Sequence, residues 1–260
     1  MGRFWQWALM GVALGVGGDA IAPAVGQTAS PSTAPTVVVS TLAEIEAAAN
    51  AQDLEAVMAL YSEGFDSDTG FDHSQLRQTL ETLWNEYSDL TYDIELLSWE
   101  AVGPDRYTVE TLTRIEGRQL RPERELNLVA EVTSRQQLEG GQVAYQEVLA
   151  ETSRLTSGVN PPTVLVQLPE TLTVGQTYSF DTIVMEPLEG RSLMGVAVDE
   201  GVTSEDFFAP RPVVFDVLNA GGLYKIGTAS DQADHRWISA VIIREDGLLV
   251  DTRRIRVMDE

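Results

Sequence analysis

The hydrophobic positions between residues 72 and 99 change their period part-way, and this change defines the first expected elements. Up to residue 90, apolar side chains recur on one face at the spacing of an α-helix. Asp72, followed three residues later by Gln75, fits the start of that helix as a capping box. From Leu90 to Leu96 apolar and polar residues alternate, as in a half-buried strand. A long helix that runs directly into strands predicts a curved sheet folded around that helix. The stripe on the helix consists of Leu76, Leu80, Leu83, Trp84 and Tyr87.

The same periods predict the elements on either side. Two short amphipathic helices precede residue 62, and Asp53 is a plausible cap for the second of them. Four strands joined by short turns are expected up to residue 157, and a stiff junction at Pro161 and Pro162 follows. Beyond it, seven short β-rich runs predict an immunoglobulin-like β-sandwich. We therefore expect an α+β cone, with helices packed in a curved antiparallel sheet, followed by an all-β sandwich. The four strands of the cone are expected at Thr91–Trp99, Arg106–Ile115, Glu125–Ser134 and Gln142–Leu155.

The first 26 residues have the layout of a secretory signal peptide. A single base, Arg3, precedes an apolar run, and the small residues Ala24 and Gly26 fit the −3 and −1 positions of a cleavage site. The alternative is an uncleaved membrane anchor, although the run is short for a span. We predict an exported protein, in the periplasm or another extracytoplasmic compartment, with no membrane contact in its mature form. The expected boundaries are 1–26 signal peptide, 27–38 linker, 39–157 first domain and 158–260 sandwich.

Composition excludes several classes of function. The chain has 40 acidic residues against 17 basic ones, a formal net charge of −23, so nucleic acid is not an expected partner. It has no cysteine, which excludes disulfides, thiolate catalysis and cysteine–zinc sites. The two histidines, His73 and His235, are not at metal-ligand spacing. The loop with Asp66 and Asp68 lacks the ligand register of a calcium loop and is expected to be a solvated turn. We predict no metal and no cofactor.

Candidate binding residues come from the inward-facing positions of the first domain. Trp84 and Tyr87 lie on the helix stripe, and Tyr92 and Tyr107 lie in phase with the apolar side of their strands. Glu147 is the one strand carboxylate in phase with Val143, Tyr145 and Leu149, and is therefore expected inside the cone. Each of these residues also has a plain core or rim interpretation. No residue is assigned a catalytic role.

Four arginines form the one concentrated group of positive charge in the sequence. Arg114, Arg118, Arg121 and Arg124 are expected in a turn between two strands. Interleaved glutamates favour a self-paired, solvated loop. The functional alternative is a surface that binds an acidic partner or a second copy of the chain.

The first domain resembles the nuclear transport factor 2-like (ketosteroid isomerase-like) superfamily, over about Thr41 to Ser157. The resemblance rests on the helix pair, in Ala48, Asp53, Leu54, Glu55, Ala56, Val57, Leu60 and Tyr61. It implies a cone that holds a small apolar ligand; some members are isomerases or dehydratases, and many are non-catalytic. The segment Leu168–Phe180 is similar to the opening of bacterial immunoglobulin-like modules.

These observations predict an exported, non-catalytic binding or assembly protein. Its expected partners are a small apolar ligand and either a second copy of itself or an envelope protein. The alternative is a small-molecule enzyme of isomerase or hydrolase type that uses the cone. An enzyme would need a buried ionisable group at the ligand, and this requirement separates the two hypotheses.

Overall fold

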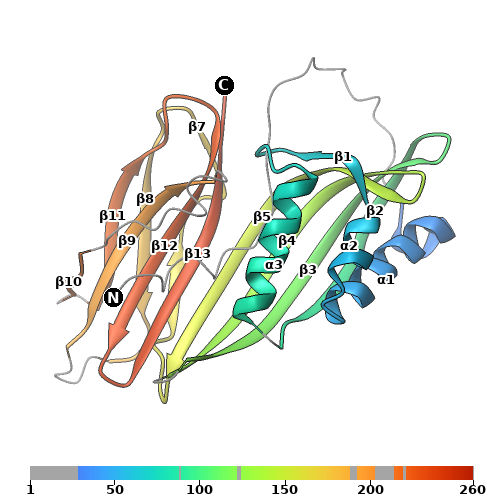
Figure 1. The fold of residues 1–260 in the computed structure, drawn as a ribbon. Coiled ribbons are helices and arrows are strands. Elements are labelled where there is room, and N and C mark those ends of the chain that lie inside the picture. Colours follow the sequence, from blue (N-terminus) through green and yellow to red (C-terminus); the bar gives the residue numbers. More distant parts are fainter. Residues whose placement is uncertain are drawn as a thin grey trace. The chain divides into compact units, whose positions relative to one another are not determined.

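The structure is a computed structural model that describes residues 29–87, 89–121, 124–187, 192–202, 214–218 and 221–259, without the side chains of Leu120 and Arg121. Of these residues, 59% are in strands and 18% in helices. The strands form a ten-stranded sheet and a three-stranded sheet (Figure 1). The path of the larger sheet is β10-β9-β12-β13-β5-β4-β3-β2, with β1 beside β5 and β7 beside β13.

The chain divides into two compact units, and we describe each by itself. Within the described residues, the helical unit comprises 29–117 and 131–151, and the β unit comprises 118–130 and 152–259. One strand, β5 (Gln142–Gly158), contributes its first part to the helical unit and its last part to the β unit.

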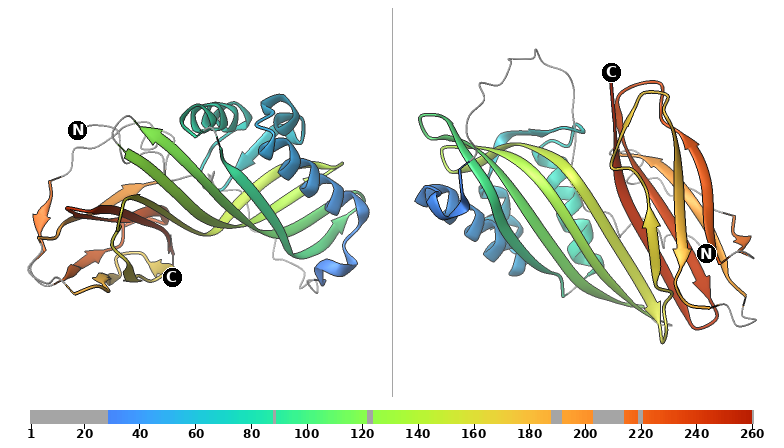
Figure 2. Two further views of the ribbon diagram at one scale, coloured as in Figure 1. Left: turned by 90° about the horizontal axis from the view of Figure 1, so that it is seen from below. Right: turned by 180° about the vertical axis from the view of Figure 1, so that it is seen from behind.

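The helical unit contains three α-helices on one face of its strands (Figures 1 and 2). Its helices are η1 (Pro31–Thr33), α1 (Thr36–Asn50), α2 (Leu54–Ala59) and α3 (His73–Glu86). Its strands are β1 (Tyr61–Ser67), β2 (Thr91–Gly103), β3 (Arg106–Arg121), β4 (Arg124–Glu139) and the start of β5, and the tips of β3 and β4 belong to the β unit. Strands β2 and β3 are antiparallel, whereas β1 runs parallel to β5.

The helix starts agree with the sequence. Asp72 caps α3, accepting a hydrogen bond from the Gln75 backbone N–H, and the Gln75 side chain accepts one from Asp72 N–H. Asp53 caps α2 by accepting from Ala56 N–H. These contacts satisfy N–H groups that the first helical turn leaves without a backbone partner. Both predicted caps are confirmed.

Side chains of α1 cover part of the outer edge of β2. Asn50 accepts from Tyr92 N–H (2.7 Å) and donates to the Tyr92 carbonyl (2.8 Å). Two residues further along, Ile94 N–H donates to Glu46 Oε2 (2.8 Å). These bonds replace a neighbouring strand, and they protect backbone groups that would otherwise recruit one.

The β unit packs strands of both sheets around one apolar core. Its strands are β6 (Val164–Gln167), β7 (Thr171–Thr173), β8 (Thr177–Val184), β9 (Met194–Gly201), β10 (Asp216–Val217), β11 (Gly222–Thr228), β12 (Asp234–Arg244), β13 (Gly247–Met258) and the end of β5. The small sheet has the order β11-β8-β6. Buried members of the shared core include Phe180, Leu223, Ile238, Ile242 and Leu249.

The expected cone followed by a separate sandwich is wrong. The chain is mostly β, its α-helices are short, and a ten-stranded sheet takes the place of two independent sheets. The reason lies in β5, whose last residues Thr152–Gly158 pair with Arg253–Gly247 of β13 inside the β unit. Alternate β5 residues stay buried as far as Ser157, so the strand continues where the sequence analysis ended the first domain.

Candidate functional site

Polar side chains line the interior of the helical unit across four adjacent strands. They come from β1, β5, β4 and β3, and each is at least nine-tenths buried. Ser67 of β1 lies beside Gln146 of β5 in the strand register. We name this group the polar stripe; it consists of Ser67, Thr111, Ser134, Gln136 and Gln146.

Ion pairs on the opposite face of the sheet fix the orientation of the stripe. Arg135 of β4 pairs with Glu110 of β3 (2.8 Å) and with Glu147 of β5 (3.1 Å). Successive side chains of a strand point to opposite faces. Thr111 and Ser134, the chain neighbours of Glu110 and Arg135, therefore point away from the ion pairs.

The helices cover the face that carries the polar stripe. Val109 and Leu138 lie in phase with Thr111 and Gln136, and they pack against Val38 and Leu42 of α1. Gln136 and Gln146 each remain 8% exposed, whereas Thr111 is fully buried. The stripe thus runs from the closed interior towards a glutamine end that lies near solvent.

The two glutamines form a short hydrogen-bond relay. The Gln136 side-chain amide donates to Gln146 Oε1 at 3.2 Å, and the Gln146 amide donates to Ser134 Oγ at 3.4 Å. Within the described part of the chain, Gln136 Oε1 and Thr111 Oγ1 have no hydrogen-bond partner. A buried polar atom without a partner costs about 1–3 kcal/mol of desolvation. The relay therefore ends in an unfulfilled hydrogen-bonding group.

Apolar residues bracket the stripe on both central strands. On β4 it lies between Val132 and Leu138, and on β5 between Val143 and Val148, all of which are buried. Val132 and Val148 pack together as a small cluster of their own. The inner face therefore presents a band of neutral polar groups between two apolar bands, a combination suited to an apolar molecule with one polar group.

Trp84 and Tyr92, both expected at a ligand pocket, are brought together by the structure. The Trp84 indole N–H donates to the Tyr92 hydroxyl oxygen at 3.0 Å. Burial raises the pKa of Tyr92 to about 12, against a smaller opposing effect of the Trp84 hydrogen bond. Tyr92 pairs with Ile115, four residues from Thr111, which is roughly 13 Å along β3 at about 3.3 Å per residue.

The other expected pocket residues lie elsewhere. Tyr87 ends α3 and is fully buried, and its carbonyl accepts from the Gln52 side chain. Tyr107 packs near α1 against Trp99, with ring centroids 6.3 Å apart. None of the residues expected at a ligand pocket is therefore a member of the polar stripe.

Glu147 does not take the inward position predicted for it. Its side chain is 25% exposed and ion-paired with Arg135, while Gln146 is buried in its place. The cause is a change of phase in β5, where consecutive buried positions at Val143 and Gln146 are three residues apart instead of two. The strict alternation assumed from the sequence therefore put the wrong side chain inside.

The four arginines are not grouped in a turn. Arg114 lies within β3 and pairs with Asp93 (3.2 Å), Glu95 (2.9 Å) and Glu131 (3.7 Å). Arg118 and Arg124 lie in strands, are exposed and already take part in interactions. The side chain of Arg121 lies outside the described part. The expected turn is wrong because β3 and β4 extend to Arg121 and from Arg124.

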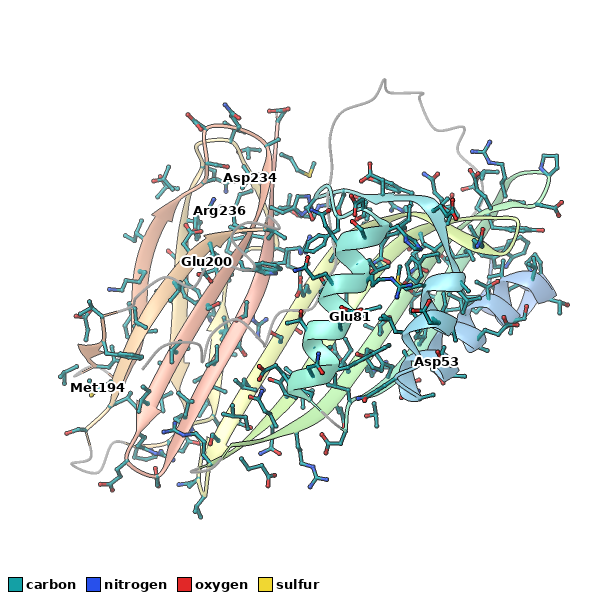
Figure 3. The ribbon with its side chains drawn as sticks, in the orientation of Figure 1. Asp53, Glu81, Met194, Glu200, Asp234 and Arg236 are labelled. Atoms are coloured by element: carbon teal, nitrogen blue, oxygen red, sulfur yellow. The ribbon has the colours of Figure 1, made fainter. Side chains whose placement is uncertain are left out.

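Charged groups elsewhere are engaged in structural contacts. Figure 3 labels Asp234 and Arg236 on β12, and Arg236 pairs with Asp234 and with Asp199 of β9. His73 Nε2 lies 3.3 Å from the Met58 carbonyl oxygen. Burial, followed by the charges of Arg254 and Arg256, lowers the pKa of His235 to about 3.

The described ranges contain neither a cluster of metal ligands nor a membrane-spanning helix. No three His, Asp or Glu side chains in them come together to hold a metal ion. No helix in the same ranges is long and apolar enough to cross a membrane.

The stripe residues were missed by the sequence analysis, although β4 carries a signal for them. Its inward positions are apolar from Leu126 to Val132, and then Ser134 and Gln136 occupy the same phase before Leu138. Polar residues that continue an apolar alternation, with an apolar residue after them, mark buried polar groups. The expected strand ended at Ser134, so this pattern was cut off.

Comparisons with known proteins add a domain family but no function. Residues 159–258 match a domain family of unknown function, DUF8623. Among solved structures, the crystal structure of IdmH 96-104 loop truncation variant is similar at 15% identity, covering 42% of this chain and 89% of that chain, with a TM-score of 0.30. A similarity of that size carries no argument here. No curated protein matches the chain.

Proposed function

We propose that this is an exported, non-catalytic binding protein whose helical unit holds a small, mainly apolar molecule against the polar stripe. The observation that carries the proposal is the presence of two buried, partnerless oxygens, at Gln136 and Thr111, with apolar bands on either side of Gln136. Proteins retain such groups at a cost, and a ligand that supplies the missing hydrogen bonds offsets that cost. The proposed export rests on Arg3, the apolar run and Ala24 with Gly26.

The chemistry of the stripe favours binding over catalysis. General acid–base catalysis requires a titratable side chain at the reacting atom. The stripe consists of serine, threonine and glutamine side chains, which do not titrate in the physiological range. The carboxylate expected inside, Glu147, lies on the other face in an ion pair, and Tyr92, with its pKa raised to about 12, stays protonated at neutral pH.

The experiment is a nuclear magnetic resonance titration of the purified full chain with N-phenyl-1-naphthylamine, an uncharged apolar probe with one N–H group. We expect saturable shifts of the backbone and side-chain amides of Gln136 and Gln146 and of the Thr111 amide. The amide of Ser239, a buried serine of the β unit bonded to Thr252, serves as the reference and should not shift. Shifts confined to exposed residues, or no saturable shift, would contradict the proposal.

A further inference from the structure

We infer that the ligand of the polar stripe is uncharged and places a hydroxyl group against the Gln136 side-chain amide, where the relay ends. This inference rests on the proposed function and specifies the ligand class for the same site. Its basis is the number and kind of hydrogen bonds that the stripe leaves unmade.

The unmade bonds require one group that can both donate and accept. In the structure, the relay of hydrogen bonds runs from Gln136 through Gln146 to Ser134, and the acceptor Gln136 Oε1 has no donor. Turning both amides over reverses the relay and leaves an N–H donor at the same place. A hydroxyl satisfies either direction, whereas a carbonyl or an ether satisfies only one. The Thr111 hydroxyl, which also donates or accepts, is the second unfulfilled group.

Charged ligands do not fit these groups. Burying an ion costs several kcal/mol unless an opposite charge is adjacent, and the stripe is neutral throughout. Glu110, Arg135 and Glu147, on the same strands, point to the other face, where Arg135 pairs with both carboxylates at 2.8 and 3.1 Å. A carboxylate or an ammonium group at the stripe would therefore be buried without compensation.

The apolar bands determine the rest of the molecule. Val132 and Val148 on one side, and Leu138 and Val143 on the other, surround the polar groups with buried hydrocarbon. A ligand body that covers these residues gains hydrophobic free energy in proportion to its apolar area. The ligand class is thus an apolar alcohol or phenol.

The test uses three probes of one shape and different polar groups: 2-naphthol, naphthalene and 2-naphthoate, titrated calorimetrically into the full chain at pH 7. One hydrogen-bonded hydroxyl is worth about a factor of ten in affinity, so 2-naphthol should bind about ten-fold more tightly than naphthalene. The anionic 2-naphthoate should bind more weakly than naphthalene.

Two variants locate the effect. Gln136→Met keeps the side-chain volume and removes the end of the relay, and it should abolish the advantage of 2-naphthol while leaving naphthalene binding within about two-fold. Gln137→Met is the matched control, because the neighbouring Gln137 is exposed on the opposite face, and it should change neither affinity.

The outcomes separate the two proposals. If naphthalene binds as tightly as 2-naphthol, or 2-naphthoate binds most tightly, the hydroxyl inference is overturned while ligand binding stands. If 2-naphthol keeps its advantage in Gln136→Met, the inference is likewise overturned. If none of the three probes binds, the proposed function fails, and the inference fails with it.

Discussion

Replacing Thr111 by valine should stabilise the protein if the Thr111 hydroxyl is unpaired, and should destabilise it if the hydroxyl is hydrogen-bonded. The side chain of Thr111 is fully buried, and Oγ1 has no partner within the described residues. Valine has the same shape and fits a strand at least as well. A buried hydroxyl without a partner costs about 1–3 kcal/mol, so its removal should raise the free energy of unfolding by about 1 kcal/mol. Because most substitutions of buried residues are destabilising, an increase in the free energy of unfolding would be specific evidence for the unpaired hydroxyl.

The assay is equilibrium urea unfolding followed by circular dichroism at 222 nm, because the α-helices described here all lie in the helical unit. The variant should unfold at higher urea concentration with an unchanged slope. Thr41→Val is the matched control in the same unit, because the buried Thr41 hydroxyl donates to the Gly141 carbonyl at 3.2 Å. That substitution should cost about 1 kcal/mol.

A loss of stability in Thr111→Val as large as that in Thr41→Val would refute the reasoning. It would mean that the Thr111 hydroxyl is already satisfied in the free protein. The proposal for a ligand at the stripe would then lose one of its two unfulfilled groups.

Three further predictions concern the scaffold. Asp72→Ala removes the α3 cap and should lower the free energy of unfolding of the helical unit, measured in urea, by about 1–2 kcal/mol. Glu81→Ala, on the exposed side of α3 (labelled in Figure 3), is the control and should change the free energy of unfolding by no more than about 0.5 kcal/mol. Equal effects of the two substitutions would argue against the cap. His235 has a pKa of about 3 in the folded chain, below its unfolded value of about 6.5, so the unfolded chain alone takes up this proton as pH falls. The free energy of unfolding should therefore decrease by at most about 5 kcal/mol as the pH falls from 6.5 to 3, and the decrease should be smaller in His235→Gln. Identical pH profiles of the parent protein and this variant in urea unfolding would contradict the prediction. A fragment of residues 161–260 lacks Thr152–Gly158, the partner of β13. Compared with a fragment of residues 152–260, it should self-associate in ultracentrifugation and unfold at a lower urea concentration. Equal behaviour of the two fragments would show that β13 does not need that partner.

Local rules predicted the helical parts of the fold well. The apolar face predicted for the helix comprised Leu76, Leu80, Leu83, Trp84 and Tyr87, and all are buried except Trp84, which is half-buried. Both predicted caps form. These features depend on residues three or four positions apart, which the sequence shows directly.

The organisation of the strands could not be predicted in the same way. Pairing of β5 with β13 joins residues about a hundred positions apart, and nothing in either segment alone identifies its neighbour. The phase change in β5 shifted the inward position from Glu147 to Gln146. The parallel strand β1, which pairs with β5 over this segment, has a register shift between Tyr61 and Asp66 that neither sequence pattern predicts.

The candidate site required knowledge of which strands are adjacent. Ser134 and Gln136 were visible as polar interruptions of an apolar alternation on β4. Their relay partner Gln146 and the isolated hydroxyl of Thr111 lie on the two neighbouring strands. The sequence pattern could therefore indicate a buried polar position but not a polar band across the sheet.

The most direct test of the central claim is a crystal structure of the protein grown with 2-naphthol. Ligand binding at the polar stripe predicts electron density for the naphthol ring between the apolar bands of β4 and β5. Its hydroxyl should lie within about 3.2 Å of the Gln136 side-chain amide. A structure in which side chains or a single ordered water fill that position, with no naphthol at the stripe, would contradict the account.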